Sequence, residues 1–113
     1  MLDPTTTVTF AIANVSNDGQ AYEEFCDSLA WQFGGISETV GRGMWNEMDT
    51  QVWERTHFVS VDVLTSELTA GMLAGMAMAA KFLAVELGER AIRINVTDSL
   101  AGNVYADENG VIE

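Results

Sequence analysis

The sequence predicts an α+β fold with the element order β-α-β-β-α-β, in which four strands form one layer and two helices form the other. Three observations lead to this prediction. Apolar residues alternate with small or polar ones in several short stretches, as they do in half-buried strands. In two other stretches, apolar residues dominate over the length of a helix, and one of them shows clear helical spacing. Glycines follow both of these stretches, at the position where helices commonly end.

The first half of the chain is expected to hold a strand, a helix and a weaker strand. Alternation around Val8, Phe10 and Ile12 predicts a strand over about residues 6–14. Residues 16–19 are a turn and a helix cap, and Gly34-Gly35 ends the helix. The apolar stripe of this helix is Tyr22, Phe25, Leu29 and Phe33. The stretch 36–45, interrupted by Gly41 and Gly43, predicts an edge strand with a bulge or a bend.

The second half repeats the pattern and adds a tail. A polar turn at 46–50 leads into the clearest strand, 52–64, and Thr65-Ser66-Glu67 opens a second helix over about 66–87 that Gly88 ends. Residues 92–97 alternate as a last strand, and Asn109-Gly110 favours a hairpin in the tail. We therefore expect a ferredoxin-like two-layer sandwich, in which the first and third strands are central. It forms one domain over 1–113, with its core at about 6–98 and a C-terminal extension at 99–113.

The charge balance excludes some classes of function. Seventeen acidic residues stand against five basic ones, for a formal net charge of −12. Such a charge repels nucleic acids and anionic membranes and attracts basic surfaces, so we expect neither direct nucleic-acid binding nor a membrane partner. The chain has one cysteine, Cys26, and one histidine, His57, so a cysteine-type zinc site is excluded and no metal or cofactor is expected. The N-terminus lacks the pattern of a signal peptide, which predicts a cytoplasmic protein.

The principal hypothesis is a non-catalytic acidic binding protein that presents carboxylates to a basic groove, where they imitate phosphate charge. No spacing assembles a convincing catalytic set, and no catalytic residue is assigned. An exposed tryptophan on the first helix is a further contact candidate. The predicted partner-binding residues are Glu23, Glu24, Asp27, Trp31, Glu47 and Asp49.

The alternative hypothesis is a dimeric small-molecule-binding protein or small enzyme with a pocket between sheet and helices. Its candidate ligand-binding residues are Tyr22, Arg42, Trp45, Trp53, Arg55 and His57. Strand alternation places Glu54 and His57 on opposite faces, which argues against a Glu–His acid–base pair. A structural component of a virion is a third reading that the sequence leaves open.

The second helical stretch is apolar nearly all round, beyond the single stripe that a surface helix needs. It is read either as a core helix with small outer residues or as a self-association surface; a membrane span is disfavoured because alanine and glycine are only weakly lipophilic. The second reading predicts a homodimer with its contact at Gly71, Gly75, Met78 and Phe82. The competing outcome is that residues 100–112 fold back and cover this stripe.

Four short features carry a resemblance to a known group. They are the threonine-rich first strand, Gly41-Arg42-Gly43-Met44-Trp45, Glu54 near the start of the third strand, and Glu89-Arg90-Ala91-Ile92 before the last strand. In these the chain resembles small ferredoxin-like proteins carried by bacteriophages. It is similar as well to acidic phage proteins that block host defence by occupying surfaces meant for nucleic acid. The resemblance implies a basic partner, such as a host defence nucleoprotein, and carries over no catalytic residue.

Overall fold

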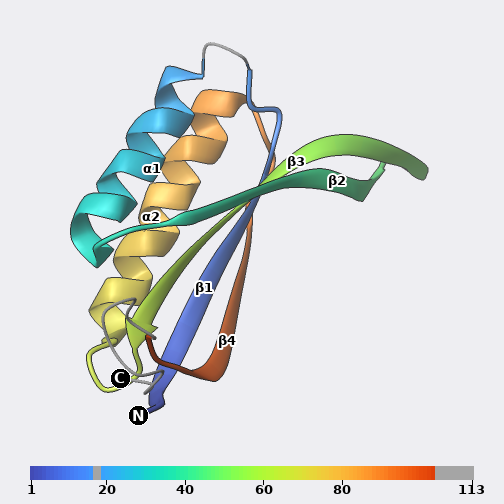
Figure 1. The fold of residues 1–113 in the computed structure, drawn as a ribbon. Coiled ribbons are helices and arrows are strands. Elements are labelled where there is room, and N and C mark those ends of the chain that lie inside the picture. The colour runs from blue at the N-terminus through green and yellow to red at the C-terminus, as the bar shows by residue number, and fades with distance from the viewer. Residues whose placement is uncertain (17–18, 104–113) are drawn as a thin grey trace.

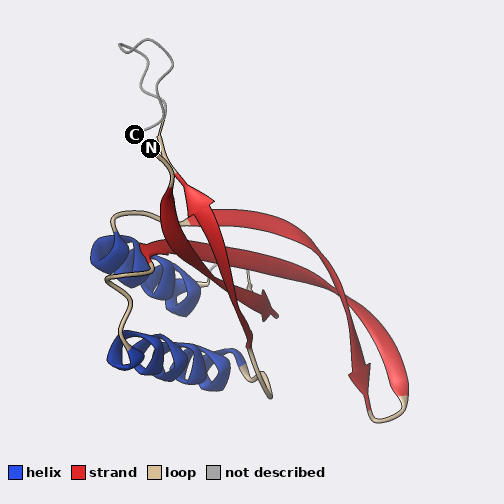
Figure 2. Cartoon of the chain, turned by 90° about the horizontal axis from the view of Figure 1, so that it is seen from below, coloured by secondary structure: helices blue, strands red, loops and turns tan. Residues whose placement is uncertain are grey.

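The computed structural model describes residues 1–16 and 19–103, and its elements follow the predicted order (Figure 1). The elements are β1 (Asp3–Ala13), α1 (Gln20–Phe33), β2 (Ser37–Glu47), β3 (Thr50–Leu64), α2 (Ala70–Leu87) and β4 (Arg93–Ala101). The strands form an antiparallel sheet in the order β2-β3-β1-β4, so β1 and β3 are central as predicted. Both helices cover the same face of the sheet, which gives the two-layer α+β sandwich of the ferredoxin-like fold (Figure 2).

The core lies between the sheet and the helices, and strand alternation selects its members. Val8, Phe10 and Ile12 of β1 are fully buried, with Val59 and Val61 beside them on β3. The helices contribute Tyr22, Phe25, Leu29, Met76, Ala80 and Leu83. The rings of Phe10 and Phe25 meet edge to face, with centroids 5.2 Å apart.

Several boundaries differ from the expected ones. Helix α2 begins at Ala70, not at 66, because the Thr69 hydroxyl accepts a hydrogen bond from the backbone N–H of Met72 at 3.1 Å and caps the helix there. Strand β4 continues to Ala101, past the expected end of the core, because it pairs with β1 as far as Asp3. The predicted tail hairpin falls on residues 104–113, which lie outside the described part of the chain.

Strand β2 was predicted to contain a bulge or a bend, and of these two alternatives the bulge is wrong. The β2–β3 register runs residue for residue from Ser37↔Ser60 to Glu47↔Thr50, through both glycines. Only Met48 and Asp49 form the turn, both at positive φ, which is the geometry of a two-residue hairpin loop. Gly41 and Gly43 lie in a strand pair, β2 with β3, that curves along its length, as Figure 1 shows.

The outer part of this hairpin extends beyond the sheet as a two-stranded arm. Strand β1 pairs with β3 only from Thr56 to Leu64, so residues 50–55 pair with β2 alone. On the arm, the guanidinium of Arg42 lies 4.7 Å from the ring centroid of Trp53, a cation–π contact. Trp53 is 54% exposed and Met48 is 97% exposed, so the arm presents apolar side chains to water.

Helix α2 also leaves an apolar face uncovered among the described residues. Met76, Ala80 and Leu83 face the core, whereas Met78, Phe82 and Val85 are exposed. By length and composition alone α2 would be able to cross a membrane, a criterion that the core helices of soluble proteins also meet. The expected alternative, that residues 100–112 cover this stripe, falls mostly outside the described part of the chain.

Candidate functional site

A cavity of about 460 Å³ opens between the start of α1, the start of β2 and the middle of β3. This volume lies in the range of small-molecule sites. Three carboxylates line it, from Glu23, Asp27 and Glu38, together with one guanidinium, from Arg55. Ser16, Tyr22, Cys26 and His57 complete its polar lining, and Val15 and Ile36 are its larger apolar residues. We call it the acidic cavity.

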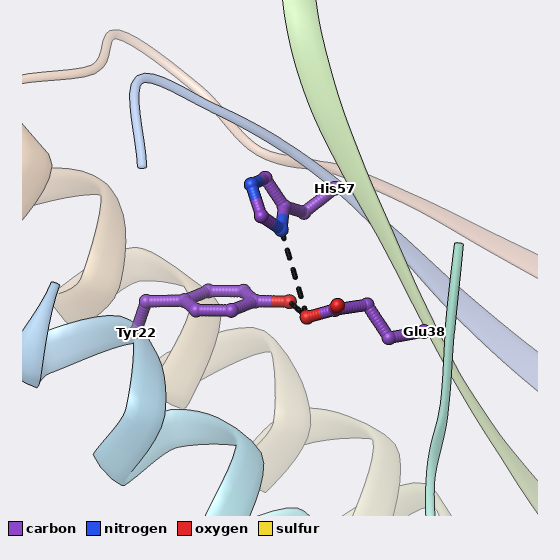
Figure 3. Close-up of polar contacts among 3 residues, drawn as sticks. All are labelled: Tyr22, Glu38 and His57. Atoms are coloured by element: carbon purple, nitrogen blue, oxygen red, sulfur yellow. Dashed lines mark hydrogen bonds and ion pairs between the residues drawn. The ribbon is translucent and has the colours of Figure 1, made fainter. Parts of the chain in front are cut away.

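Tyr22, Glu38 and His57 form a connected group in the acidic cavity (Figure 3). The hydroxyl of Tyr22 donates a hydrogen bond to Oε2 of Glu38. Nδ1 of His57 lies 3.5 Å from the same oxygen, an ion-pair distance for a protonated imidazole but too long for a good hydrogen bond. The rings of Tyr22 and His57 are in contact, with centroids 4.9 Å apart. One carboxylate oxygen therefore lies between a phenol and an imidazole.

The sheet register explains why these residues meet. Val40 pairs with His57 and Glu38 pairs with Val59, so Glu38 and His57 are diagonal neighbours on the face that the helices cover. Tyr22 comes from the first turn of α1, where the apolar stripe of that helix faces the same side of the sheet. The side chain of His57 is 11% exposed and that of Glu38 is 42% exposed, so the carboxylate lies at the mouth of the acidic cavity.

The pKa shifts in the acidic cavity have clear causes. The hydrogen bond from Tyr22, with a smaller contribution from His57, lowers the pKa of the Glu38 carboxyl below its ordinary value. Burial, reinforced by the bond to Glu38, raises the pKa of the Tyr22 phenol, which stays protonated at neutral pH. Burial also raises the pKa of the Cys26 thiol. The arrangement thus offers an ionised carboxylate and a phenol donor, while Cys26 is a poor nucleophile.

The structure brings together only half of the predicted ligand-binding residues. Tyr22, Arg55 and His57 line the acidic cavity, whereas Arg42 and Trp53 pair on the arm. Strand alternation places Trp45 on the opposite face of the sheet. Glu54 and His57 point to opposite faces, as the alternation predicted.

Sequence reasoning missed Glu38, the carboxylate that His57 does contact. The signal was available, because alternation puts Glu38 on the same strand face as Ile36 and Val40. A carboxylate on the apolar face of a strand needs a polar partner, and the turn at Met48-Asp49 fixes the register that supplies one. Without that register, the pairing of residues 38 and 57 was not apparent.

The predicted partner-binding residues do not gather on one surface. Glu23 and Asp27 line the acidic cavity, whereas Glu24 lies on the groove between the two helices. Trp31 is 90% exposed on α1. Glu47 ends β2 and Asp49 is in the turn at the tip of the arm, well away from α1 in both Figure 1 and Figure 2.

The predicted oligomer contact residues are exposed. Met78 is 46% exposed and Phe82 is 62% exposed, and both Gly71 and Gly75 lie on the surface. A Cβ added at Gly75 would have open space around it, so packing within the chain does not require glycine there. In the described part of the chain, no group of three or more histidine, cysteine, aspartate or glutamate side chains is placed to hold a metal ion.

Comparison with known proteins gives a likeness of fold. No family model matches the sequence, and no curated protein matches it. Among solved structures, it is similar to a phage SAM lyase in complex with S-methyl-5′-thioadenosine, with a TM-score of 0.57 and 15% identity over 97% of this chain and 84% of that chain. It is also similar to a phage SAM lyase in the apo state, with a TM-score of 0.53 and 10% identity over 99% and 85% of the two chains.

This likeness corrects the principal hypothesis drawn from the sequence. The principal hypothesis of a non-catalytic charge mimic is corrected, because the two similar solved structures named above are both of a phage SAM lyase, one of them with a bound small molecule. The likeness favours the alternative hypothesis of a small-molecule-binding protein or small enzyme. The resemblance to small phage-borne proteins with a ferredoxin-like fold is confirmed at the level of structure.

Proposed function

We propose that this protein is an enzyme of the SAM lyase type, which binds S-adenosylmethionine in the acidic cavity and cleaves it to S-methyl-5′-thioadenosine. The observation that carries the proposal is the Glu38 carboxylate, held between Tyr22 and His57 in a cavity of small-molecule size. Its fold is shared with a structure that contains S-methyl-5′-thioadenosine.

The charges of the acidic cavity suit this substrate. S-adenosylmethionine carries a sulfonium cation, and three carboxylates line the cavity against one guanidinium. The aromatic ring of Tyr22 adds a surface on which a cation is favourable. Arg55 offers a planar donor fork to the carboxylate at the other end of the substrate.

The product defines the bond that breaks. S-methyl-5′-thioadenosine keeps the methyl and adenosyl carbons on sulfur, so cleavage falls between sulfur and the γ-carbon of the methionine chain. Both electrons of that bond go to sulfur, which becomes a neutral thioether. A lyase uses no water, so the four-carbon fragment either loses a proton or bonds that carbon to its own carboxylate oxygen. For the first route, Glu38 and His57 are the side chains of the acidic cavity that can act as a base.

The sulfonium charge disappears as the bond breaks, so the residues that bind the cation differ in role from those that accelerate the reaction. Carboxylates that stabilise the cation improve substrate binding without lowering the barrier, since the transition state has lost part of that charge. The rate acceleration then comes from holding the methionine part of the substrate in a reactive geometry and from proton transfer. We assign Glu23 and Asp27 to binding, and Glu38 with its partners Tyr22 and His57 to positioning and proton transfer.

The experiment is direct. Purified protein is incubated with S-adenosylmethionine, and S-methyl-5′-thioadenosine is measured by liquid chromatography and mass spectrometry. We expect product from the wild type, a loss of about 100-fold or more in Glu38→Gln, and wild-type rates in Glu86→Gln. Glu86→Gln makes the same charge change on α2, outside the acidic cavity. Binding without product would reject the lyase and leave a binding protein; no binding would reject both.

Consumption of S-adenosylmethionine would remove a methyl donor from the cell. Within this proposal, an action against host defence would work by depleting a small molecule and not by occupying a protein surface.

A further inference from the structure

Arg42 and Arg55 lie directly opposite each other at the base of the arm, as the β2–β3 register shows. Directly opposite residues of an antiparallel pair point to the same face, with Cβ atoms about 5 Å apart, and like charges in this position are unfavourable. The whole chain has only five basic residues against seventeen acidic ones, so two of the five facing each other calls for an explanation. An anion held by both guanidiniums supplies one. We call these two residues the arginine pair.

The arginine pair borders the acidic cavity. Strand alternation places both arginines on the face that carries His57, and Arg55 is itself part of the cavity lining. The pKa of the Glu38 carboxyl, lowered mainly by the hydrogen bond from Tyr22, is lowered further by the charge of Arg55. The pair therefore adds a cationic edge to a cavity in which carboxylates outnumber cations.

Trp53 supports one member of the arginine pair. It precedes Arg55 by two residues on β3 and so shares its face. The Cζ atom of Arg42 lies over the Trp53 ring, 4.7 Å from its centroid. Such a cation–π contact is made by the charge over the ring and requires no N–H donor, so the donors of Arg42 can still meet an acceptor. The contact fixes the guanidinium at the edge of the cavity before a ligand arrives.

We propose that the arginine pair is a clamp for the α-carboxylate of S-adenosylmethionine, in which both guanidiniums donate hydrogen bonds to the carboxylate oxygens. This inference rests on the proposed lyase function. It adds Arg42 to the residues that bind the substrate, with Trp53 as a positioning residue behind it. It also makes the carboxylate a requirement for tight binding, so the clamp selects the amino-acid end of the substrate.

The spacing along β3 suits this assignment. Alternate residues of a strand lie about 6.7 Å apart, so Arg55 is one such step from His57. Four bonds separate the sulfonium sulfur from the carboxylate carbon. A methionine chain laid along β3 can therefore place its sulfur near Glu38 and His57 and its carboxylate at the arginine pair.

The formal charges agree as well. The three carboxylates of the acidic cavity and the two guanidiniums leave one negative charge. The sulfonium, ammonium and carboxylate of the substrate leave one positive charge. The clamp thus accepts the single anionic group of a substrate that is otherwise cationic, in a part of the site where carboxylates alone would repel that group.

Two ligands separate the clamp from the rest of the site. Sinefungin is an S-adenosylmethionine analogue in which an amine-bearing carbon replaces the sulfonium, so it keeps the α-carboxylate and cannot be cleaved to the thioether. S-methyl-5′-thioadenosine has no carboxylate. By titration calorimetry, we expect Arg42→Gln and Arg55→Gln each to weaken sinefungin binding about tenfold. The Kd of S-methyl-5′-thioadenosine should stay within about twofold of the wild-type value.

Further variants test the geometry of the clamp. Arg93→Gln removes the same charge on the opposite face of the sheet, where Arg93 pairs with Ala11, and should leave both affinities unchanged. Trp53→Leu should weaken sinefungin binding, whereas Trp53→Phe, which keeps an aromatic face, should bind it nearly as the wild type does. In the double variant of Arg42 and Arg55 the loss should be smaller than the product of the single losses, because both act on one carboxylate.

The outcomes distinguish the clamp from the lyase. Unchanged sinefungin affinity in Arg42→Gln overturns the clamp and leaves the proposed lyase site intact. The same holds if Arg93→Gln weakens sinefungin binding equally, or if Arg42→Gln weakens the binding of both ligands to the same extent. A wild type that binds S-methyl-5′-thioadenosine alone also overturns the clamp. A wild type that binds neither ligand overturns the clamp and the lyase site together.

Discussion

Glu38 is a carboxylate on a strand face that is otherwise apolar, and its surroundings explain how it is tolerated there. Its side chain reaches the mouth of the acidic cavity and keeps contact with water. The Tyr22 hydroxyl meets one of its oxygens with a charge-assisted hydrogen bond. Phenol and carboxylate therefore stabilise each other's position, and each shifts the pKa of the other in the direction that preserves the bond.

We predict that Tyr22→Phe lowers the free energy of unfolding by about 1 kcal/mol at neutral pH. The hydrogen bond contributes no more than this because the side chain of Glu38 is partly exposed to water. The folded-state pKa of Glu38 is lower than its ordinary value of 4.5, so its contribution is present above that pH and is lost as pH falls through the lower folded value. Urea unfolding of both proteins at neutral pH and at about pH 3 checks this. The difference in free energy of unfolding between the wild type and Tyr22→Phe should be smaller at the acidic pH.

Glu38→Gln supplies the control for that prediction. In its background, Tyr22→Phe should cost less, because the charged acceptor is already gone. Equal losses in both backgrounds, or a loss that persists unchanged in acid, would show that the tyrosine acts through packing alone.

Among the elements, the start of α2 shows how one side chain sets a boundary. Two candidate openings lie close together, Thr65-Ser66-Glu67 and Thr69. In the structure the first forms a turn, in which the backbone N–H of Glu67 bonds to the carbonyl of Leu64, and Thr65 bonds to Thr6 of β1. Thr69 is the residue that caps the helix.

We therefore expect Thr69→Ala to lower the free energy of unfolding by about 1 kcal/mol. Ser66→Ala, at the opening expected from the sequence, should change it by less than about 0.5 kcal/mol, because Ser66 is exposed. Thermal and urea unfolding measure both. A larger effect at Ser66 than at Thr69 would instead support a helix that starts at about residue 66.

Across the whole molecule, the described residues leave apolar surface uncovered on α2. Phe82, Val85 and Met78 are all exposed, and Phe82 borders the groove between the two helices. Monomers seldom leave a contiguous apolar patch in water. The net charge of −12 opposes association between copies, but salt screens that repulsion over about 10 Å.

We therefore predict a homo-oligomer, a two-fold dimer in the simplest closed form, with Gly71, Gly75, Met78 and Phe82 at the contact. Light scattering at micromolar concentration should give a mass near twice 12.3 kDa, and added salt should favour the larger species. Phe82→Glu should yield a folded monomer, whereas Ala77→Glu, the same charge on a different side of α2, should not. A monomeric wild type, or two variants that behave alike, would refute the contact.

The sequence by itself determined the fold class, the central position of β1 and β3, and most of the core. Apolar alternation around Val8 and Val59 and the helical stripe of α1 follow from local periodicity, and burial is the physical reason for that periodicity. The end of α2 at Gly88 was equally readable, because its φ of 68° is a conformation that glycine adopts readily. Buried hydrophobic residues follow a short-range periodicity along the sequence, so they can be predicted from the sequence alone.

Only the tertiary structure decided which polar groups meet. Tyr22, Arg55 and His57 were candidates from their chemistry, but Glu38 joins them through the register of β2 on β3 and the placement of α1 over that face. The same register sends Trp45 to the opposite face and Arg42 with Trp53 to the arm. Contacts between segments far apart in sequence depend on register and packing of whole elements, and a shift of one residue would reverse every face. Local patterns carry no record of that choice, which is why the fold was predictable and the site was not.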